Sequence, residues 1–239
     1  MKRALVTGGS GQIGAAICRQ LAQDHLHVIV HAHRHRASAE DVTRHIIEAG
    51  GSASVACFDI CDAQATQRAL AEILEAGPIQ VLVNNAGIHD DAPMAGMKTD
   101  QWSRVIAVSL DGFFNVTQPL LLPMIGTRWG RIITISSISA VLGNRGQTNY
   151  AAAKAGLHGA SKSLAREVAS RGVTVNVVAL GFIESRMVEQ SCKPEKIEAL
   201  VPMKRAGTPQ EAAHLVGFLA SENAGYISGQ IIGLNGGMA

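Results

Sequence analysis

The first 14 residues constrain the fold more than any other part of this chain. Residues 3–6 (RALV) form an apolar run typical of a buried strand, and the glycine-rich segment 7–14 (TGGSGQIG) follows directly. Ile13, Ile17 and Leu21 then recur at helical spacing. A strand, a glycine-rich loop and a helix in this order favour pyrophosphate binding, because the glycines let the backbone approach the anion and the first helical N–H groups attract its charge. The loop residues expected to contact the anion are Gly8, Ser10, Gly11, Gln12, Ile13 and Gly14.

Strand-like and helix-like segments alternate along the whole chain. The expected strands are residues 3–6, 28–31, 53–57, 81–84, 131–136, 173–178 and 231–234. The expected helices lie near residues 13–23, 39–49, 62–75, 99–125, 149–170 and 209–220, with starts at Asp62, Asp100 and Thr208. Helical crossovers make neighbouring strands parallel, and nearly continuous apolar strands fit a sheet buried on both faces. The sequence therefore predicts an α/β fold, a doubly wound sheet of seven parallel strands with helices on both faces, in a single domain over residues 1–239.

The balance of residue types excludes several other classes of protein. Apolar residues make up 47% of the chain, and the net charge of +2 is too small to favour nucleic acid or an anionic membrane surface. No segment approaches the ~20 consecutive apolar residues that span a bilayer. We therefore expect a soluble, cytoplasmic protein without nucleic acid or membrane partners.

Cysteine and histidine residues do not complete a metal site at this stage. The cysteines are scattered, which favours reduced thiols: Cys18, Cys57, Cys61 and Cys192. Cys57 and Cys61 have no second pair to complete a zinc set. The alternating His31, His33 and His35 have no accompanying cysteine or carboxylate. We expect no bound metal.

Ser137, Tyr150 and Lys154 have a spacing that supports proton transfer. Tyr150 and Lys154 lie four residues apart in an alanine-rich run, so a helix places them on one face. A free tyrosine has a pKa near ~10, and a fixed ammonium nearby lowers that pKa. Such a tyrosine can exchange a proton with a carbonyl oxygen or an alcohol, and Ser137 could bind the same oxygen. The alternative is a chance pairing, since i,i+4 pairs are common on helices.

A polar segment also follows the expected strand 81–84. The end of a strand in an open α/β sheet lies beside the ligand crevice. We therefore expect Asn85, Ala86 and Gly87 to pass beside a bound dinucleotide, although asparagine and glycine also favour ordinary turns.

With these segments identified, the chain resembles the short-chain dehydrogenase/reductase family over its whole length. Within that family it is most similar to bacterial 3-oxoacyl-[acyl-carrier-protein] reductases, most densely in residues 131–154 and 161–187. Residues 123–126 and 143–147 also resemble reductases of aryl-polyene-type pathways. The resemblance implies a Rossmann-type fold and a substrate lid at about residues 181–207.

The resemblance also implies an activity, an NADPH-dependent reduction of a 3-oxoacyl thioester on an acyl carrier protein, in fatty acid or polyketide biosynthesis. Tyr150 would be the acid, Lys154 would lower its pKa and hold the nicotinamide ribose, and Ser137 would orient the carbonyl. Asp59 would lie near the adenine amine, unless it is only a turn residue. The residues matching contacts of the nicotinamide carboxamide are Ile183 and Ser185.

Three positions depart from the family's pattern. Gln12 stands where the family's loop has its middle glycine, and it places a side chain near the pyrophosphate. The pattern Gly9-x-Gly11-x-x-Gly14 still meets the broader dinucleotide fingerprint, so we expect the middle glycine to be shifted by one position. Leu180 replaces a proline before Gly181. Ser109 stands where the family's fourth catalytic residue, an asparagine, relays protons to the lysine through water. We expect Ser109 to replace it with one extra water, or else to bond its own helix backbone.

The segment after the second expected strand indicates the cofactor. NAD enzymes of this fold carry an acid about 20 residues past the glycine loop. No acid lies here between Asp24 and Glu40, whereas Arg34 is suited to a 2′-phosphate. The sequence therefore predicts NADP(H), unless the arginines form only a solvated basic turn.

Two further expectations concern partners. Arg128 and Arg171 match the arginines that dock the acidic carrier protein in the resembling reductases, and both flank the ends of expected strands that lead to the site. Surplus apolar residues on helices 99–125 and 149–170 favour a symmetric homo-oligomer, and the resemblance implies a tetramer. These residues are Phe113, Phe114, Val116, Leu120, Leu121, Ala152, Ala155, Leu157 and Ala160.

Two alternative functions stay open at this stage. The chain could reduce an acyl-CoA or another small ketone. It could also be a weakly active, cofactor-binding partner subunit, because the fold alone does not establish catalysis.

Overall fold

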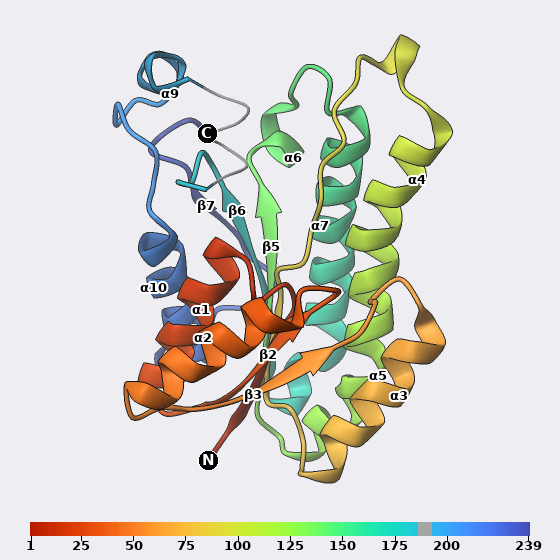
Figure 1. Cartoon of the computed structure of the whole chain (residues 1–239), viewed down its shortest axis with the longest axis vertical. Helices are drawn as coiled ribbons and strands as arrows, with labels where there is room; N and C mark the ends of the chain where they lie inside the picture. The colour runs from red at the N-terminus through yellow and green to blue at the C-terminus, as the bar shows by residue number, and fades with distance from the viewer. Residues whose placement is uncertain (186–192) are drawn as a thin grey trace.

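A seven-stranded sheet with every strand parallel forms the centre of the molecule (Figure 1). The structure is a computed structural model that describes residues 1–185 and 193–239. The strands are β1 (Arg3–Val6), β2 (His27–Ala32), β3 (Ser52–Cys57), β4 (Val81–Asn84), β5 (Gly130–Ser137), β6 (Val173–Leu180) and β7 (Ile231–Leu234). Their order is β3-β2-β1-β4-β5-β6-β7, which confirms the predicted doubly wound fold.

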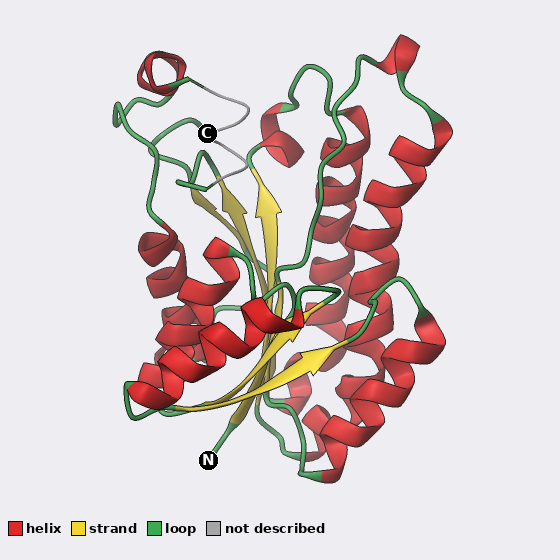
Figure 2. Cartoon of the chain, in the orientation of Figure 1, coloured by secondary structure: helices red, strands yellow, loops and turns green. Residues whose placement is uncertain are grey.

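Helices cover both faces of the sheet (Figure 2). They are α1 (Gln12–Gln23), α2 (Arg36–Glu48), α3 (Ala63–Glu75), α4 (Thr99–Ile106), α5 (Gly112–Gly126), α6 (Ser139–Leu142), α7 (Thr148–Val168), α9 (Pro194–Leu200) and α10 (Pro209–Ala220). Helices α1, α2 and α10 share one apolar core with the sheet, and α3, α5 and α7 share the other. The sequence did not predict α6 and α9, which have only 4 and 7 residues.

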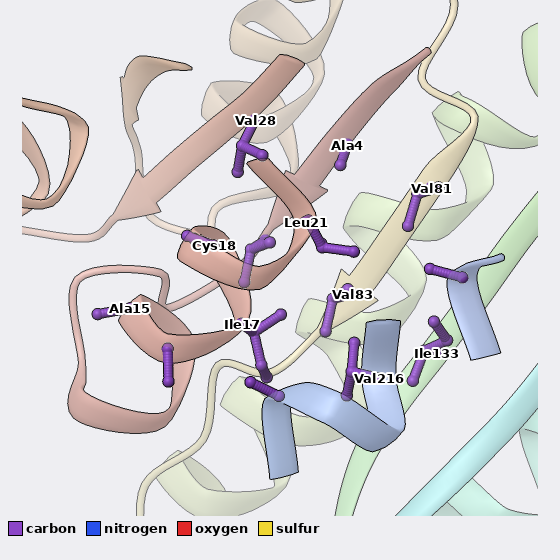
Figure 3. Packing of buried hydrophobic residues seen from close by; sticks show 14 of the residues in the cluster. Ala4, Ala15, Ile17, Cys18, Leu21, Val28, Val81, Val83, Ile133 and Val216 are labelled. Atoms are coloured by element: carbon purple, nitrogen blue, oxygen red, sulfur yellow. The ribbon is translucent and has the colours of Figure 1, made fainter. Parts of the chain in front are cut away.

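Helix α1 is held firmly against the sheet (Figure 3). Ile17 and Leu21 are fully buried, and they pack with Val83 of β4 and Val216 of α10 in the first core. This packing fixes the start of α1, and therefore the glycine loop before it, relative to the carboxyl ends of β1 and β4.

Two of the three expected helix starts are correct. Asp62 caps α3 by accepting hydrogen bonds from two backbone N–H groups, and Thr208 caps α10 in a capping box. The expected start at Asp100 is wrong, because α4 begins at Thr99 and its N-cap position is Lys98.

The expected helix 99–125 is interrupted by a π-helical turn, η2 (Ala107–Asp111). Turns of this kind insert an extra residue into a helix and occur frequently at functional sites. Ser109 lies in the middle of this turn.

The helical run Thr99–Gly126 is long and apolar enough to cross a membrane by length and composition, so the expectation of no such segment is wrong by this measure. Helices of a soluble core pass the same test, and 33% of its most apolar window is buried. Val116, Leu120 and Met124 face the core with 0% exposure, whereas Phe114 and Leu122 are 63% and 76% exposed.

Part of the expected lid at 181–207 falls on residues 186–192, which lie outside the described residues. Its described part includes α9 and a bridge that pairs Ile183 with Gly207.

Candidate active site

The predicted site residues gather at the carboxyl ends of the central strands. Gly8 follows β1, Asn85 follows β4 and Ser137 ends β5. The order of the strands reverses between β1 and β4, and ligands of open α/β sheets bind at such a point.

Close backbone packing explains the glycines of the loop. Gly8 has φ +63°, and a Cβ atom on Gly14 would lie 2.2 Å from the Gly8 carbonyl oxygen. A Cβ on Gly11 would meet no atom closer than 3.5 Å, so sterics require glycine at 14 and not at 11. Gln12 begins α1 with its side chain exposed, and Gly11 supplies no side-chain cap.

The loop is also held by polar groups that the sequence did not identify. Asn85 Nδ2 donates to the Thr7 and Gly8 carbonyl oxygens at 2.9 and 3.1 Å, and Thr7 Oγ1 accepts from the Ala86 N–H at 3.0 Å. His31 Nδ1 accepts from the Gly8 N–H at 3.1 Å, and His31 Nε2 lies 3.0 Å from the Phe58 carbonyl oxygen. Burial lowers the pKa of His31 to about 4, so the ring is neutral and Nε2 carries the proton. The signal available in the sequence is a histidine placed after the apolar run of residues 28–30 in β2.

A first cavity of about 530 Å³ collects the predicted cofactor residues. Those on its wall are Gly8, Ser10, Gly11, Gln12, Ile13, Gly14, Arg34, Asp59, Asn85, Ala86, Gly87 and Ser185. Ile183 is buried and is not on this wall. Residues on the wall that the sequence did not assign are His31, His33, His35, Ile60, Ile88 and Val108.

A second cavity of about 440 Å³ contains Ser137 and Tyr150. The Ser139 N–H donates to Ser137 Oγ at 3.1 Å, and the Ser137 side chain is close enough to Tyr150 to influence the pKa of its hydroxyl group. The expected serine–tyrosine pair is therefore formed on the wall of one cavity.

Lys154 lies beside Tyr150 and close to the first cavity. Its Nζ donates to the Ile135 carbonyl oxygen at 3.0 Å and lies 5.7 Å from the centre of the Tyr150 ring. A Cβ on Gly87 would lie 3.0 Å from the same Nζ, so the ammonium also borders the wall of the first cavity. Lys154 is 3% exposed, and burial lowers its pKa to about 8.

The expected lowering of the Tyr150 pKa is not found in the chain alone. Burial raises the pKa of Tyr150, the Ser137 side chain opposes the rise, and the Asp91 carboxylate adds to it. Lys154 does not reverse this, because its ammonium is directed to Ile135. Tyr150 is therefore protonated at neutral pH, which suits a proton donor.

Asn149 fixes the position of Tyr150 and was missed in the sequence. It is fully buried, and its Oδ1 accepts from the Tyr150 N–H at 2.8 Å. Its Nδ2 donates to the carbonyl oxygens of Asp90 and Gln101 at 3.0 and 3.1 Å. The start of α7 is thus tied to α4 and to the loop after β4.

Ser109 is 3% exposed, and within the described residues its Oγ has no hydrogen-bond partner. The expected alternative, a bond to its own helix backbone, is therefore not formed. A cavity of about 10 Å³ lies beside it, which is close to the space one water needs.

The described part of the chain contains no group of three side chains able to hold a metal ion. His31 instead serves the glycine loop, and Cys57 donates to the His33 carbonyl oxygen at 3.2 Å.

Comparison with known proteins gives a consistent result. The model of the short chain dehydrogenase family matches residues 2–196. The chain is 44% identical to 3-oxoacyl-[acyl-carrier-protein] reductase FabG of Escherichia coli (strain K12), over 99% of this chain and 97% of the relative. It is 41% identical to the FabG reductase of Aggregatibacter actinomycetemcomitans, over 98% of each. It is 43% identical to nodulation protein G of Azospirillum brasilense, over 99% of this chain and 98% of the relative.

Proposed function

The chain belongs to the short-chain dehydrogenase family, and we propose that it reduces a 3-oxoacyl thioester to the 3-hydroxyacyl thioester with NADPH. It is an oxidoreductase, and its family uses a nicotinamide cofactor. One observation carries the proposal: Tyr150 and Ser137 share a cavity, while Lys154 lies between Tyr150 and the wall of the other cavity.

The residues present fit a dinucleotide. The start of α1 has no side-chain cap, and it leaves backbone N–H groups beside a cavity of about 530 Å³. The loop is held there by the close approach of Gly8 and Gly14 and by the hydrogen bond from Asn85 to the Gly8 carbonyl oxygen. When bound, the cofactor supplies a hydride. The residues proposed to hold it are Gly8, Ser10, Gly11, Gln12, Ile13, Gly14, Arg34, Asp59, Asn85, Ala86, Gly87, Tyr150, Lys154, Ile183 and Ser185.

Tyr150 and Ser137 act on the substrate carbonyl in this proposal. The Tyr150 hydroxyl gives its proton to the carbonyl oxygen, and the Ser137 hydroxyl donates a hydrogen bond to the same oxygen. The Lys154 ammonium stabilises the phenolate left on Tyr150, and its burial keeps that charge poorly screened by water.

We expect Arg34→Gln to raise KM for NADPH about tenfold or more and to leave KM for NADH unchanged. Arg34 is on the cavity wall, and no ion pair or hydrogen bond of its side chain occurs among the described residues. A lost charge-assisted contact with a phosphate is worth about 1.5–3 kcal/mol. Steady-state kinetics with both cofactors measure the change.

Arg36→Gln is the matched control. Arg36 is exposed and does not line the first cavity, and its Nε donates to Glu40 at 2.8 Å. Comparable kcat/KM values for NADPH and NADH in the wild type would contradict the cofactor assignment.

We expect Ser109→Ala to slow turnover about ten- to a hundredfold, the scale of one proton-relay element. Ser109→Asn should keep or improve the rate, because its amide reaches further than a hydroxyl. Both expected rates follow from the position of Ser109 Oγ, which is buried, has no partner among the described residues and lies beside space for a water. The turnover rates of the two variants relative to the wild type measure the effect. A fully active alanine variant would remove Ser109 from the mechanism.

The two arginines of the carrier-docking proposal flank the ends of β5 and β6 that are far from Ser137. Arg128 and Arg171 precede β5 and β6, so they lie at the amino ends of the strands, whereas Ser137 ends β5. The 8 residues of β5 separate these ends by about 25 Å. The two arginines therefore do not flank the site of their own protomer. We retain them as docking residues for an acidic carrier bound across a second copy of the chain.

Some of the apolar residues expected to contact a second copy of the chain are instead buried within it. Val116, Leu120 and Leu157 are core residues. The apolar face open to a partner consists of Phe114 and Leu122 on α5, with Ala152 and Ala155 on α7. We propose a homotetramer in the cytoplasm.

Reduction of an acyl-CoA or a small ketone is the second candidate, and a weakly active partner subunit is the third. A turnover assay with NADPH separates them, using one 3-oxoacyl group on carrier protein, on coenzyme A and as a free ketone. The proposed function requires the highest kcat/KM on the carrier protein.

A further inference from the structure

Two cations that have no partner among the described residues lie on the wall of the second cavity. Arg145 and Lys196 are both exposed and line this cavity with Ser137 and Tyr150. Across residues 1–185 and 193–239, neither guanidinium nor ammonium forms an ion pair or a hydrogen bond. Both charges are therefore available to a ligand in the cavity.

The acid on the same wall forms no ion pair with either cation among the described residues. Asp91 Oδ1 lies 3.1 Å from His89 Nδ1, and Asp91 Oδ2 accepts from Gln147 Nε2 at 2.9 Å. Asp91 is the one acidic residue among the described residues of this wall. Two cations against one carboxylate leave the described wall with excess positive charge.

The backbone that carries Arg145 is well fixed. Gly143 and Gly146 on either side have φ +73° and +83°. Asn144 Nδ2 donates to Gln147 Oε1 at 2.9 Å, and the Gly146 carbonyl oxygen accepts from the Ala92 N–H at 2.9 Å. A fixed turn presents its cation with little further loss of entropy on binding.

We propose that Arg145 and Lys196 bind the phosphate of a phosphopantetheine arm. The inference rests on the proposed function, because thioesters on carrier proteins and on coenzyme A share this arm and its phosphate. Tyr150 and Ser137 are the less exposed part of the wall, and Arg145 and Lys196 are exposed. A thioester whose carbonyl contacts Tyr150 therefore directs its arm toward the two cations. An arginine fork matches phosphate oxygens, and Lys196 adds a point charge.

The test compares two thioesters of one 3-oxoacyl group, one on phosphopantetheine and one on pantetheine without the phosphate. For the wild type, KM should be about five- to tenfold lower with the phosphate, the sum of two exposed charge contacts. Raising the salt concentration should shrink this preference. In R145Q/K196Q the preference should vanish through a rise in KM for the phosphorylated substrate, with kcat retained.

Arg166→Gln with Lys193→Gln is the matched control, since both cations are exposed and neither lines the cavity. This double variant should keep the preference. An equal KM for the two thioesters in the wild type, or a preference that survives in R145Q/K196Q, would overturn the proposal.

A third thioester separates the phosphate from another source of negative charge. It carries a terminal carboxylate on the acyl chain and pantetheine without phosphate. If only this substrate gains from Arg145 and Lys196, the cations bind the acyl end and the phosphate assignment fails.

If the proposed function itself is wrong, the protein turns over none of the thioesters, and this result differs from an equal KM for the two thioesters. Calorimetric titration of phosphopantetheine and pantetheine into the protein with NADP⁺ then decides the anion site without catalysis. Equal binding of both compounds by the wild type would overturn it.

Discussion

Replacing Tyr150 with phenylalanine should reduce turnover by about 10²–10⁴-fold, the contribution of a positioned proton donor. The ring would still pack beside Lys154, and the start of α7 would still be held by Asn149, so NADPH should bind with near wild-type affinity. Steady-state kinetics and a fluorescence titration of NADPH measure the two effects. A variant that kept a tenth of the wild-type rate would show that Tyr150 is not the acid.

Tyr226→Phe is the control for this prediction. The chain has only 2 tyrosines, and Tyr226 is fully exposed outside both cavities. Its loss should leave turnover and cofactor binding unchanged.

Replacing Lys154 with methionine should lower turnover by a similar factor and also weaken cofactor binding. The ammonium lies 5.7 Å from the centre of the Tyr150 ring and borders the first cavity near Gly87, so it is placed for both tasks. Because its pKa is lowered to about 8, wild-type reduction should decline as pH rises above that value. Retained NADPH affinity in the variant would contradict the second task.

The same variant should stabilise the protein without cofactor. The folded-state pKa of Lys154, about 8, lies below its usual value of 10.5, so burying the charged ammonium costs stability at neutral pH. Lys154→Met should therefore raise the free energy of unfolding at pH 7 by roughly 1–3 kcal/mol. The gain should shrink between pH 8 and 10.5, where the wild-type ammonium loses its proton on folding. Urea unfolding across this pH range measures it, and a variant less stable at pH 7 would contradict the account.

The sequence was a good guide wherever a short segment carries the information. The loop 7–14, the segment Asn85–Gly87 and the pair Tyr150 and Lys154 each depend on local spacing, and the fold brings them together as expected. The order of parallel strands guarantees this, because the carboxyl ends of β1, β4 and β5 meet at one edge of the sheet.

Features that depend on tertiary contacts were not predictable in this way. His31 holds the glycine loop from the next strand, and Asn149 joins α7 to two distant segments. Burial, which no spacing reveals, sets the direction of the pKa change of Tyr150. In the long helical run, Val116 faces the core and Phe114 is exposed. Which residues face the core depends on how the helix is rotated about its axis, and the π-helical turn changes that rotation.

The central claim is that this site reduces the 3-oxo group of a thioester with hydride from NADPH. The most direct measurement supplies NADPH deuterated at the reactive carbon together with a 3-oxoacyl-carrier-protein, and analyses the product by mass spectrometry. The account predicts a 3-hydroxyacyl product with deuterium on C3, formed by the wild type and lost in Tyr150→Phe. Oxidation of NADPH without that product, or a product without deuterium, would contradict it.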